Sequence, residues 1–158
     1  MTFGLDSDWQ SGCRQTAQTK ALVQDGQAVS SRTTTHVLES DEPQALLGTD
    51  HAASAGEYIL QALAGCYAVT FATCAATRGI ELTSLRLELN ADFDLHGFLG
   101  LDEDVRPGAQ EIRVLVHAES PNAAQRDLEE LTALVQARSP IRDTLAGAVN
   151  VRTSLAAA

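Results

Sequence analysis

Apolar and polar residues alternate along two segments in the second half of the chain, as they do in strands with one buried face. Alternate positions are apolar from Leu85 to Phe93, and the same spacing links Ile112 to Val116. A nearly uncharged stretch over residues 55–78 precedes them and is typical of a buried central helix. The pattern therefore predicts a long helix followed by two strands.

The expected helix over residues 55–78 has signals at both ends. Ser54 precedes it and Glu57 stands three residues later, which is the spacing of a capping box. Gly79 lies where a left-handed residue ends a helix. Residues 58–77 carry no charge and have about the length of a membrane span. Six alanines and several threonines interrupt the large apolar residues, so we expect a buried helix and no membrane partner.

In the first third of the chain, the sequence predicts an irregular arm at residues 1–11 and then a hairpin. Segments 14–23 and 28–38 are rich in Thr, Val and Ala and flank the Asp25-Gly26 turn signal. Residues 41–52 have the composition of a loop.

The last third predicts two helices and a final strand. The helices are expected to open at Ser120-Pro121 and Ser139-Pro140, and residues 149–155 to form the strand. The order ββ-α-ββ-αα-β predicts one α/β domain of the α+β type over residues 1–158, an antiparallel sheet with helices on one side.

Length and charge narrow the classes of function. A chain of 158 residues can bury one core, and its 44% hydrophobic content is ordinary for a globular protein. The formal net charge of −10 repels phosphate backbones, so we expect no nucleic-acid partner. Acidic residues near the N-terminus are unlike a secretory signal, and three scattered cysteines are unlike a disulfide framework. A cytoplasmic location is therefore expected.

The sequence shows no motif for a metal or a cofactor. The four histidines have no ligand spacing to one another or to a cysteine. Phosphate-binding glycine loops, nucleophile elbows and dinucleotide fingerprints are missing as well. We therefore expect neither a cofactor nor a metal, and the thiols remain the candidate chemistry.

Cys66 and Cys74 lie on the same expected helix, about 12 Å apart along its axis. A disulfide needs Cα atoms within roughly 7 Å, so these two cannot pair in one intact helix. From its helix position alone, Cys66 is interpreted as a structural thiol. Glu57 lies on nearly the opposite side of the helix, and Ser139 is interpreted as an ordinary N-cap.

Four blocks of the sequence carry a resemblance, and they occur in the order LLGTDHAASAGEYILQALAGC, ATRGIEL, DLHGFLGLDEDVRPGAQEIRV and RSPIRDTL. From about Arg32 to Leu155, the chain resembles the OsmC/Ohr family of osmotically inducible and organic hydroperoxide resistance proteins, and most of all a less characterised branch. The resemblance implies an OsmC-like fold with a long central helix, in an intertwined homodimer with two interface sites. It also implies that Cys66 is a peroxidatic thiolate, which attacks a hydroperoxide and becomes a sulfenic acid that a second cysteine resolves.

The chain departs from the two-cysteine peroxidases of that family. Ser139 stands before Pro140 at the position of the second cysteine. Gly56 occupies the position of the activating glutamate, with Glu57 one step away, and Arg32 is the candidate for the activating arginine. A complete two-cysteine peroxidase is therefore not expected.

Two functions remain as alternatives. The first is a one-cysteine hydroperoxide reductase, in which a small thiol or a thiol protein reduces the sulfenic acid of Cys66. Arg142, if it faces Cys66, would stabilise the thiolate and polarise the peroxide. The second is a non-catalytic dimer that binds a small apolar ligand in the interface pocket. If the RSPIRDTL segment packs against the central helix, Ser139 should lie close to Cys66.

Overall fold

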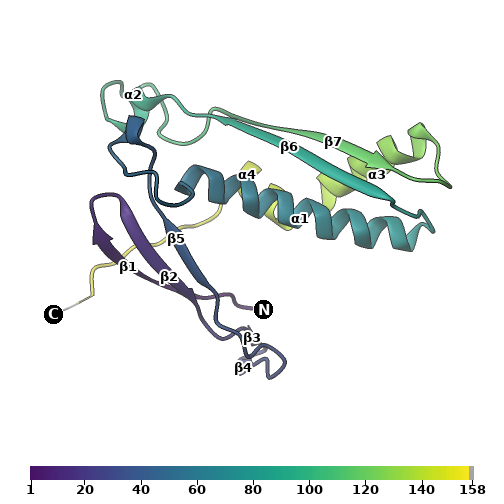
Figure 1. Cartoon of the computed structure of the whole chain (residues 1–158), viewed down its shortest axis with the longest axis horizontal. Coiled ribbons are helices and arrows are strands. Elements are labelled where there is room, and N and C mark those ends of the chain that lie inside the picture. Colours follow the sequence, from purple (N-terminus) through teal and green to yellow (C-terminus); the bar gives the residue numbers. More distant parts are fainter. Residues whose placement is uncertain (157–158) are drawn as a thin grey trace. The chain divides into compact units, whose positions relative to one another are not determined.

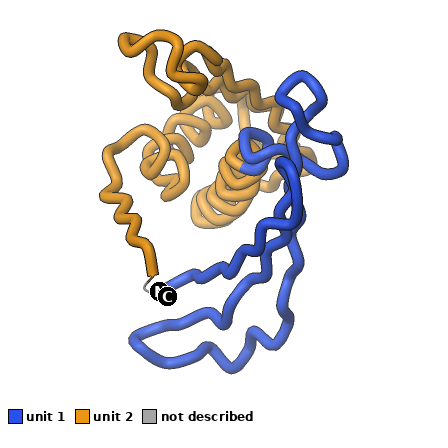
Figure 2. The backbone as a smooth tube through the Cα atoms, turned by 90° about the vertical axis from the view of Figure 1, so that its left-hand side faces the viewer, with its two compact units in different colours: residues 1–58 blue, residues 59–158 orange. Residues whose placement is uncertain are grey.

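A computed structural model describes residues 1–156, and the chain forms two compact units (Figure 2). The first comprises residues 1–58, and the second begins at Ile59, within the long helix. All paired strands are antiparallel. They form three small sheets rather than the single sheet expected from the sequence.

The largest sheet of the first unit has the order β1-β2-β5, formed by β1 (Leu5–Ser11), β2 (Arg14–Thr19) and β5 (Val37–Ser40) (Figure 1). The irregular arm expected at residues 1–11 is therefore wrong. Every residue of β1 is exposed, so the strand lacks the alternation that reveals a buried face. Antiparallel backbone pairing with β2 keeps the β1 strand in place instead.

A short hairpin follows, between β3 (Val23–Gln24) and β4 (Gln27–Ala28). Asp25 and Gly26 both adopt positive φ, at 50° and 80°, as a two-residue hairpin turn requires. The turn is thus confirmed, but the long strands expected on either side of it are wrong. β2 pairs with β1 and β5, because the chain leaves the sheet after Thr19 and returns only at Val37.

The segment between β5 and the long helix is a loop, as expected, with one 3-10 turn, η1 (Gln44–Leu46). The buried carboxylate of Asp41 organises it by accepting hydrogen bonds from the backbone N–H groups of Glu42, Thr49 and His51. The Thr49 hydroxyl donates a further bond and is the largest of the causes that lower the pKa of Asp41 to about 2. The loop is therefore fixed by one ionised side chain.

The long helix α1 (Ala55–Thr77) begins and ends as the sequence predicts. The Ser54 hydroxyl accepts the Glu57 N–H, and the Glu57 carboxylate accepts the Ser54 N–H at 2.7 Å, which lowers the pKa of Glu57. Gly79 has a φ of 67°. By length and composition α1 also suits a membrane span, as core helices of soluble proteins often do. Its five buried residues favour the core-helix interpretation.

In the second unit, α1 packs against the ribbon of β6 (Ser84–Asp92) and β7 (Glu111–Glu119), which runs along it (Figure 1). Helix α3 (Gln125–Arg138) completes the core, and α4 (Pro140–Ala146) follows it. The two strands face the core through the alternating apolar residues that predicted them. The buried core residues of this unit are Leu63, Tyr67, Phe71, Cys74, Ala75, Leu131 and Val135.

Two expectations for the last third of the chain are wrong. Helix α3 begins at Gln125 rather than at Pro121, because the Asn122 side chain ties the preceding turn to Gly79 and Glu81. Residues 149–155 form no strand. Within the described residues they have no neighbouring strand to pair with, and Leu155 is almost fully exposed.

Candidate functional site

The sulfur of Cys66 lies against the side chain of Ser139, which is 73 residues away in sequence. The Ser139 hydroxyl donates a hydrogen bond to Cys66 Sγ over 3.2 Å. Cys66 is half-buried on α1, whereas Ser139 is only 1% exposed. The expectation that position 139 packs beside Cys66 is therefore confirmed, and the functional roles of the two residues stay predictions.

Ser139 is held in place by the local chemistry of a helix start. It is the N-cap of α4, with Pro140 at the first helical position, and its Oγ accepts the Arg142 N–H at 3.3 Å. Because the oxygen accepts this bond, the single hydroxyl proton is free to point at sulfur. The N-cap expected from the sequence thus also serves as a donor to the thiol.

A cavity of about 660 Å³ lies within the second unit, and its lining includes Tyr67, which follows Cys66 in the sequence, and Arg142, whose backbone N–H bonds to Ser139. Its apolar wall comes from α1, β7 and α4, through residues such as Ile59, Val114 and Leu145. Its polar lining includes Tyr67, which directly follows Cys66, and Arg142, which is three residues after Ser139. The cavity has the size and mixed lining of a small-molecule site.

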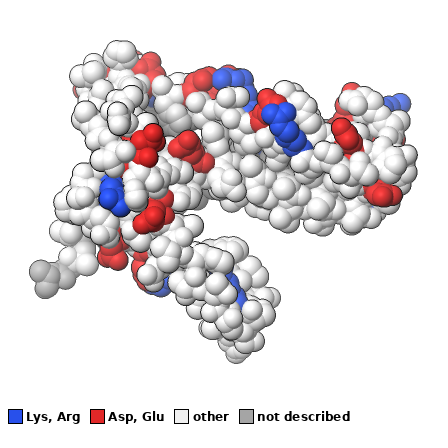
Figure 3. Space-filling model, in the orientation of Figure 1, with Lys and Arg blue, Asp and Glu red and all other residues white. Residues whose placement is uncertain are grey.

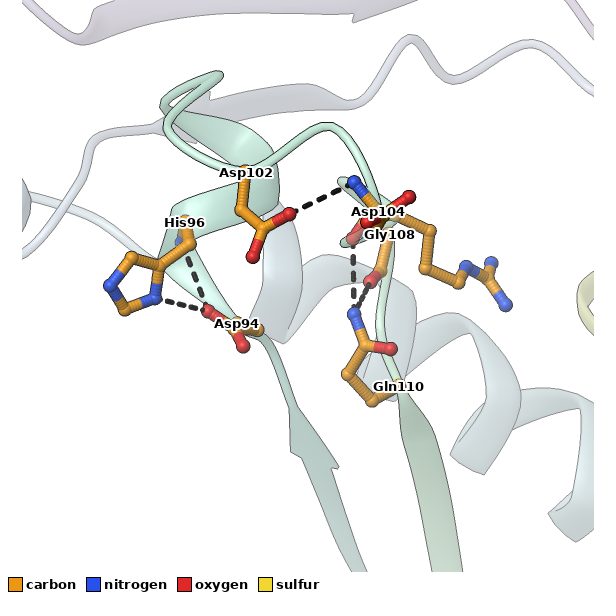
Figure 4. Close-up of polar contacts among 7 residues, drawn as sticks. Asp94, His96, Asp102, Asp104, Gly108 and Gln110 are labelled. Carbon is orange, nitrogen blue, oxygen red and sulfur yellow. Dashed lines mark hydrogen bonds and ion pairs between the residues drawn. The ribbon is translucent and has the colours of Figure 1, made fainter.

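The loop between β6 and β7, whose polar contacts are shown in Figure 4, contributes several residues to the lining of the cavity. The Gln110 side-chain amide donates to the carbonyls of Arg106 at 3.0 Å and of Gly108 at 3.2 Å, and all three residues line the cavity. The Asp94 carboxylate accepts the His96 N–H and caps the short helix α2 (Leu95–Phe98), which lowers the pKa of Asp94. Local hydrogen bonds therefore hold the shape of the loop.

Tyr67 lines the cavity, and its phenol interacts electrostatically with Cys66 and Arg142. Burial raises the pKa of its phenol; the nearby Arg142 guanidinium partly offsets this change, and the charge of Cys66 adds to it. Tyr67 is 6% exposed and belongs to the hydrophobic core of the unit. Its phenol and the Arg142 guanidinium thus both line the cavity, and both interact electrostatically near Cys66.

The other sequence candidates are placed elsewhere. Arg32 belongs to the first unit, where it lines a smaller cavity of about 260 Å³ with Phe3, Leu5 and Thr19. Glu57 is engaged in capping α1. Cys74 is 4% exposed in the core, and all three cysteines are free thiols. Of the candidate site residues, the structure brings together Cys66, Ser139 and Arg142.

Residues 48–154, about two thirds of the chain, match the family of OsmC-like proteins. The chain belongs to this family. The resemblance identified from the four sequence blocks is thereby confirmed. No curated protein sequence matches the chain closely enough to report.

Solved structures of other OsmC-like proteins share the fold. One from Mycoplasma pneumoniae has a TM-score of 0.69 at 19% identity, covering 93% of this chain and 89% of that one. One from Vibrio cholerae, of unknown function, has a TM-score of 0.67 at 11% identity, covering 91% and 93%. The organic hydroperoxide resistance protein OsmC of Legionella pneumophila has a TM-score of 0.63 at 16% identity, covering 93% and 90%. The mixed α/β fold with small antiparallel sheets and a long helix is therefore that of the family.

Sequence reasoning missed Tyr67 as a candidate for the site. An aromatic residue on an apolar helix is most simply interpreted as core, and Tyr67 does pack in the core. Its position directly after Cys66 was the only available signal. The cavity at its side chain is a tertiary feature, because strands and helices distant in sequence build the walls.

Proposed function

We propose that this OsmC-like protein is a one-cysteine hydroperoxide reductase in which Cys66 is the reacting thiol. The observation that carries the proposal is the hydrogen bond from the Ser139 hydroxyl to Cys66 Sγ, together with a cavity that has an apolar wall. A donor aimed at sulfur stabilises its negative charge, and the thiolate is the nucleophile. Arg142, in the same cavity, supplies a positive charge for the peroxide oxygens.

In the reaction, the Cys66 thiolate attacks the terminal oxygen of a hydroperoxide ROOH, and the O–O bond breaks. Sulfur gains an OH group as sulfenic acid, and RO⁻ takes a proton and leaves as the alcohol. The organic group R lies along the apolar wall formed by Ile59, Leu63 and Val114. The hydroperoxide-resistance function of the Legionella relative supports this substrate class.

An external thiol completes the cycle in this proposal. Ser139 has no sulfur with which to resolve the sulfenic acid, and Cys74 is buried in the core eight residues along the helix from Cys66. A small thiol or a thiol protein therefore attacks the sulfenic acid, and a second thiol equivalent releases Cys66. In this proposal the reductant enters through the cavity that Tyr67, the neighbour of Cys66 in the sequence, and Arg142 line.

Hydroperoxide consumption with a dithiol reductant tests the proposal. We expect turnover of tert-butyl hydroperoxide by the wild-type chain and its loss in Cys66→Ser. The matched control is Cys13→Ser, which removes a half-buried thiol from the first unit and should retain activity. If Cys66→Ser consumed the hydroperoxide as fast as the wild type, Cys66 would not be the reacting thiol.

A non-catalytic ligand-binding protein is the second candidate, and the apolar cavity wall favours it. This alternative predicts that the wild-type chain consumes no hydroperoxide, while an apolar ligand such as cumyl alcohol still binds. Isothermal titration on the wild type and Cys66→Ser would then give equal affinities. Turnover that depends on Cys66 excludes the alternative.

A homodimer belongs to the same proposal, because α1 exposes a face with small uncharged residues. Beyond Glu57 in its first turn, α1 carries no charged side chain, and the surface below β6 and β7 is largely white in Figure 3, whereas the strands carry both signs. Small residues let a second helix approach closely, and Val69 is 68% exposed on that face. We expect light scattering to give a dimer, and Ala72→Glu to give a monomer. A wild-type monomer at micromolar concentration would contradict this.

A further inference from the structure

Tyr67 has a buried phenol without a protein hydrogen-bond partner in residues 1–156. The side chain is 6% exposed, yet no hydrogen bond of the described residues includes its hydroxyl. Buried tyrosine hydroxyls usually find a partner. No fully enclosed side-chain oxygen or nitrogen in this part of the chain lacks one, so the Tyr67 oxygen is not sealed in the core. It opens on the cavity that the side chain lines.

Tyr58, the other tyrosine of the chain, has a phenol with a structural role and serves as a comparison. Tyr58, on the first turn of α1, donates a hydrogen bond to the Glu39 carbonyl at 2.6 Å. Its hydroxyl therefore ties the helix to the end of β5. Tyr67 makes no such hydrogen bond, and its aromatic ring alone accounts for its packing in the core. The free hydroxyl is left for a ligand of the cavity.

The surroundings of Tyr67 keep its hydroxyl protonated. Burial raises the pKa of the phenol above its ordinary value, and the Cys66 charge acts in the same direction. Arg142 opposes the rise but is the smaller influence. At neutral pH the phenol is thus a proton donor, which lines the cavity together with Arg142 and lies close enough to Cys66 and Arg142 for both to influence its pKa.

We propose that Tyr67 is a catalytic proton donor, which protonates the alkoxide that leaves when Cys66 attacks a hydroperoxide. The inference rests on the function proposed above. As the O–O bond breaks, the Tyr67 O–H proton passes to RO⁻ and ROH forms. The phenolate then regains a proton from solvent through the cavity. Arg142 stabilises the negative charge while it passes from the leaving oxygen to the phenolate.

A comparison of two oxidants tests this role, because only one of them needs the proton. tert-Butyl hydroperoxide leaves as a strongly basic alkoxide, whereas peracetic acid leaves as acetate, which is stable without a proton. We expect Tyr67→Phe to slow sulfenic acid formation by tert-butyl hydroperoxide about 100-fold, within the range of general acid catalysis. With peracetic acid the rate should hardly change. The phenylalanine ring retains the core packing, and an unchanged rate with peracetic acid would itself show an intact site.

Tyr58→Phe is the matched control, and stopped-flow measurement with a sulfenic acid trap gives the rates at Cys66. This variant loses a phenol from the same helix outside the cavity and should leave both rates unchanged. If Tyr67→Phe slowed both oxidants equally, or neither, the proton-donor role would be overturned while Cys66 kept its role. If the wild-type chain formed no sulfenic acid with either oxidant, the proposed function would fail and this inference with it.

Discussion

Asp41 and Ser139 are the most deeply buried polar side chains of the described residues, each 1% exposed, and they use their hydrogen bonds differently. Asp41, in the first unit, accepts bonds only from Glu42, Thr49 and His51, in its own loop. Ser139, in the second unit, accepts one bond from Arg142 and donates one to Cys66 on a distant helix. Equal burial therefore accompanies a closed local network in one case and a link to the thiol of a distant helix in the other.

The difference teaches that the partner, rather than the burial, distinguishes a structural polar group from a candidate functional one. The partners of Asp41 are backbone donors that would otherwise be unsatisfied, so its role is complete within the loop. The partner of Ser139 is the thiol of Cys66, which is the reacting group in the proposed function. Substitutions at the two positions should thus have different effects, which the following predictions measure.

The largest expected effect is a new covalent bond in Ser139→Cys. The Oγ–Sγ separation is 3.2 Å, so an introduced thiol needs about 1 Å of closer approach to reach disulfide length. After mild peroxide treatment, we expect a disulfide between Cys66 and residue 139, detected by mass spectrometry of unreduced peptides. Cys74 should remain a free thiol because the helix rise separates it from Cys66. A variant that never forms the bond would contradict the packing of α4 against α1.

The second prediction concerns Asp41→Ala, which removes the acceptor that the whole loop shares. Three backbone N–H groups and the Thr49 hydroxyl lose their partner, and unpaired buried donors are costly. We expect the amides of Thr49 and His51 to lose their protection from hydrogen exchange. Glu42→Ala, a neighbouring carboxylate, is the control and should retain it. Unchanged protection in Asp41→Ala would show that the loop holds its shape without the carboxylate.

The sequence predicts those elements whose signals are local. Ser54, Glu57 and Gly79 mark the ends of α1 correctly, and alternation reveals β6 and β7, because caps and pleats depend on neighbours along the chain. β1 escapes prediction because it has no buried face. Residues 149–155 have the composition of a strand but lack a pairing partner among residues 1–156.

The candidate site was predictable only in part, because its contacts join residues that are distant in the sequence. The family resemblance points to Cys66 and to Ser139 at the second-cysteine position, and their contact follows from the packing of α4 against α1. Composition alone does not reveal that Asp41 is buried, because an acidic residue at the start of a loop is ordinarily solvated. The cavity and the free phenol of Tyr67 depend on residues from four elements, α1, β7, α3 and α4, and on the loop between β6 and β7.

The third prediction separates the two roles of Ser139. Ser139→Ala removes an N-cap, which costs about 1 kcal/mol of stability, and it also removes the donor to Cys66. We therefore expect slower alkylation of Cys66 by iodoacetamide near neutral pH. Ser54→Ala loses a cap of the same kind at the start of α1, where it touches no thiol. Equal alkylation rates in the two variants would mean that Ser139 acts only as a cap.

The smallest expected effect is confined to acid and concerns Asp41. Its folded pKa is about 2, against an ordinary value of 3.8, so the ionised form is favoured by folding. The stability that it contributes is complete above about pH 4 and is lost as the pH falls towards 2. We expect the exchange protection of the Thr49 and His51 amides to decrease over this window in the wild type. In Asp41→Asn the protection should be lower at neutral pH and nearly constant between pH 4 and pH 2, because an amide does not titrate there. Since Glu57 and Asp94 also have lowered pKa values, the difference between the two chains isolates Asp41 from the other carboxylates. An acid transition of equal size in both chains would assign it to those other groups, and the closed network of the loop would then not depend on the charge of Asp41.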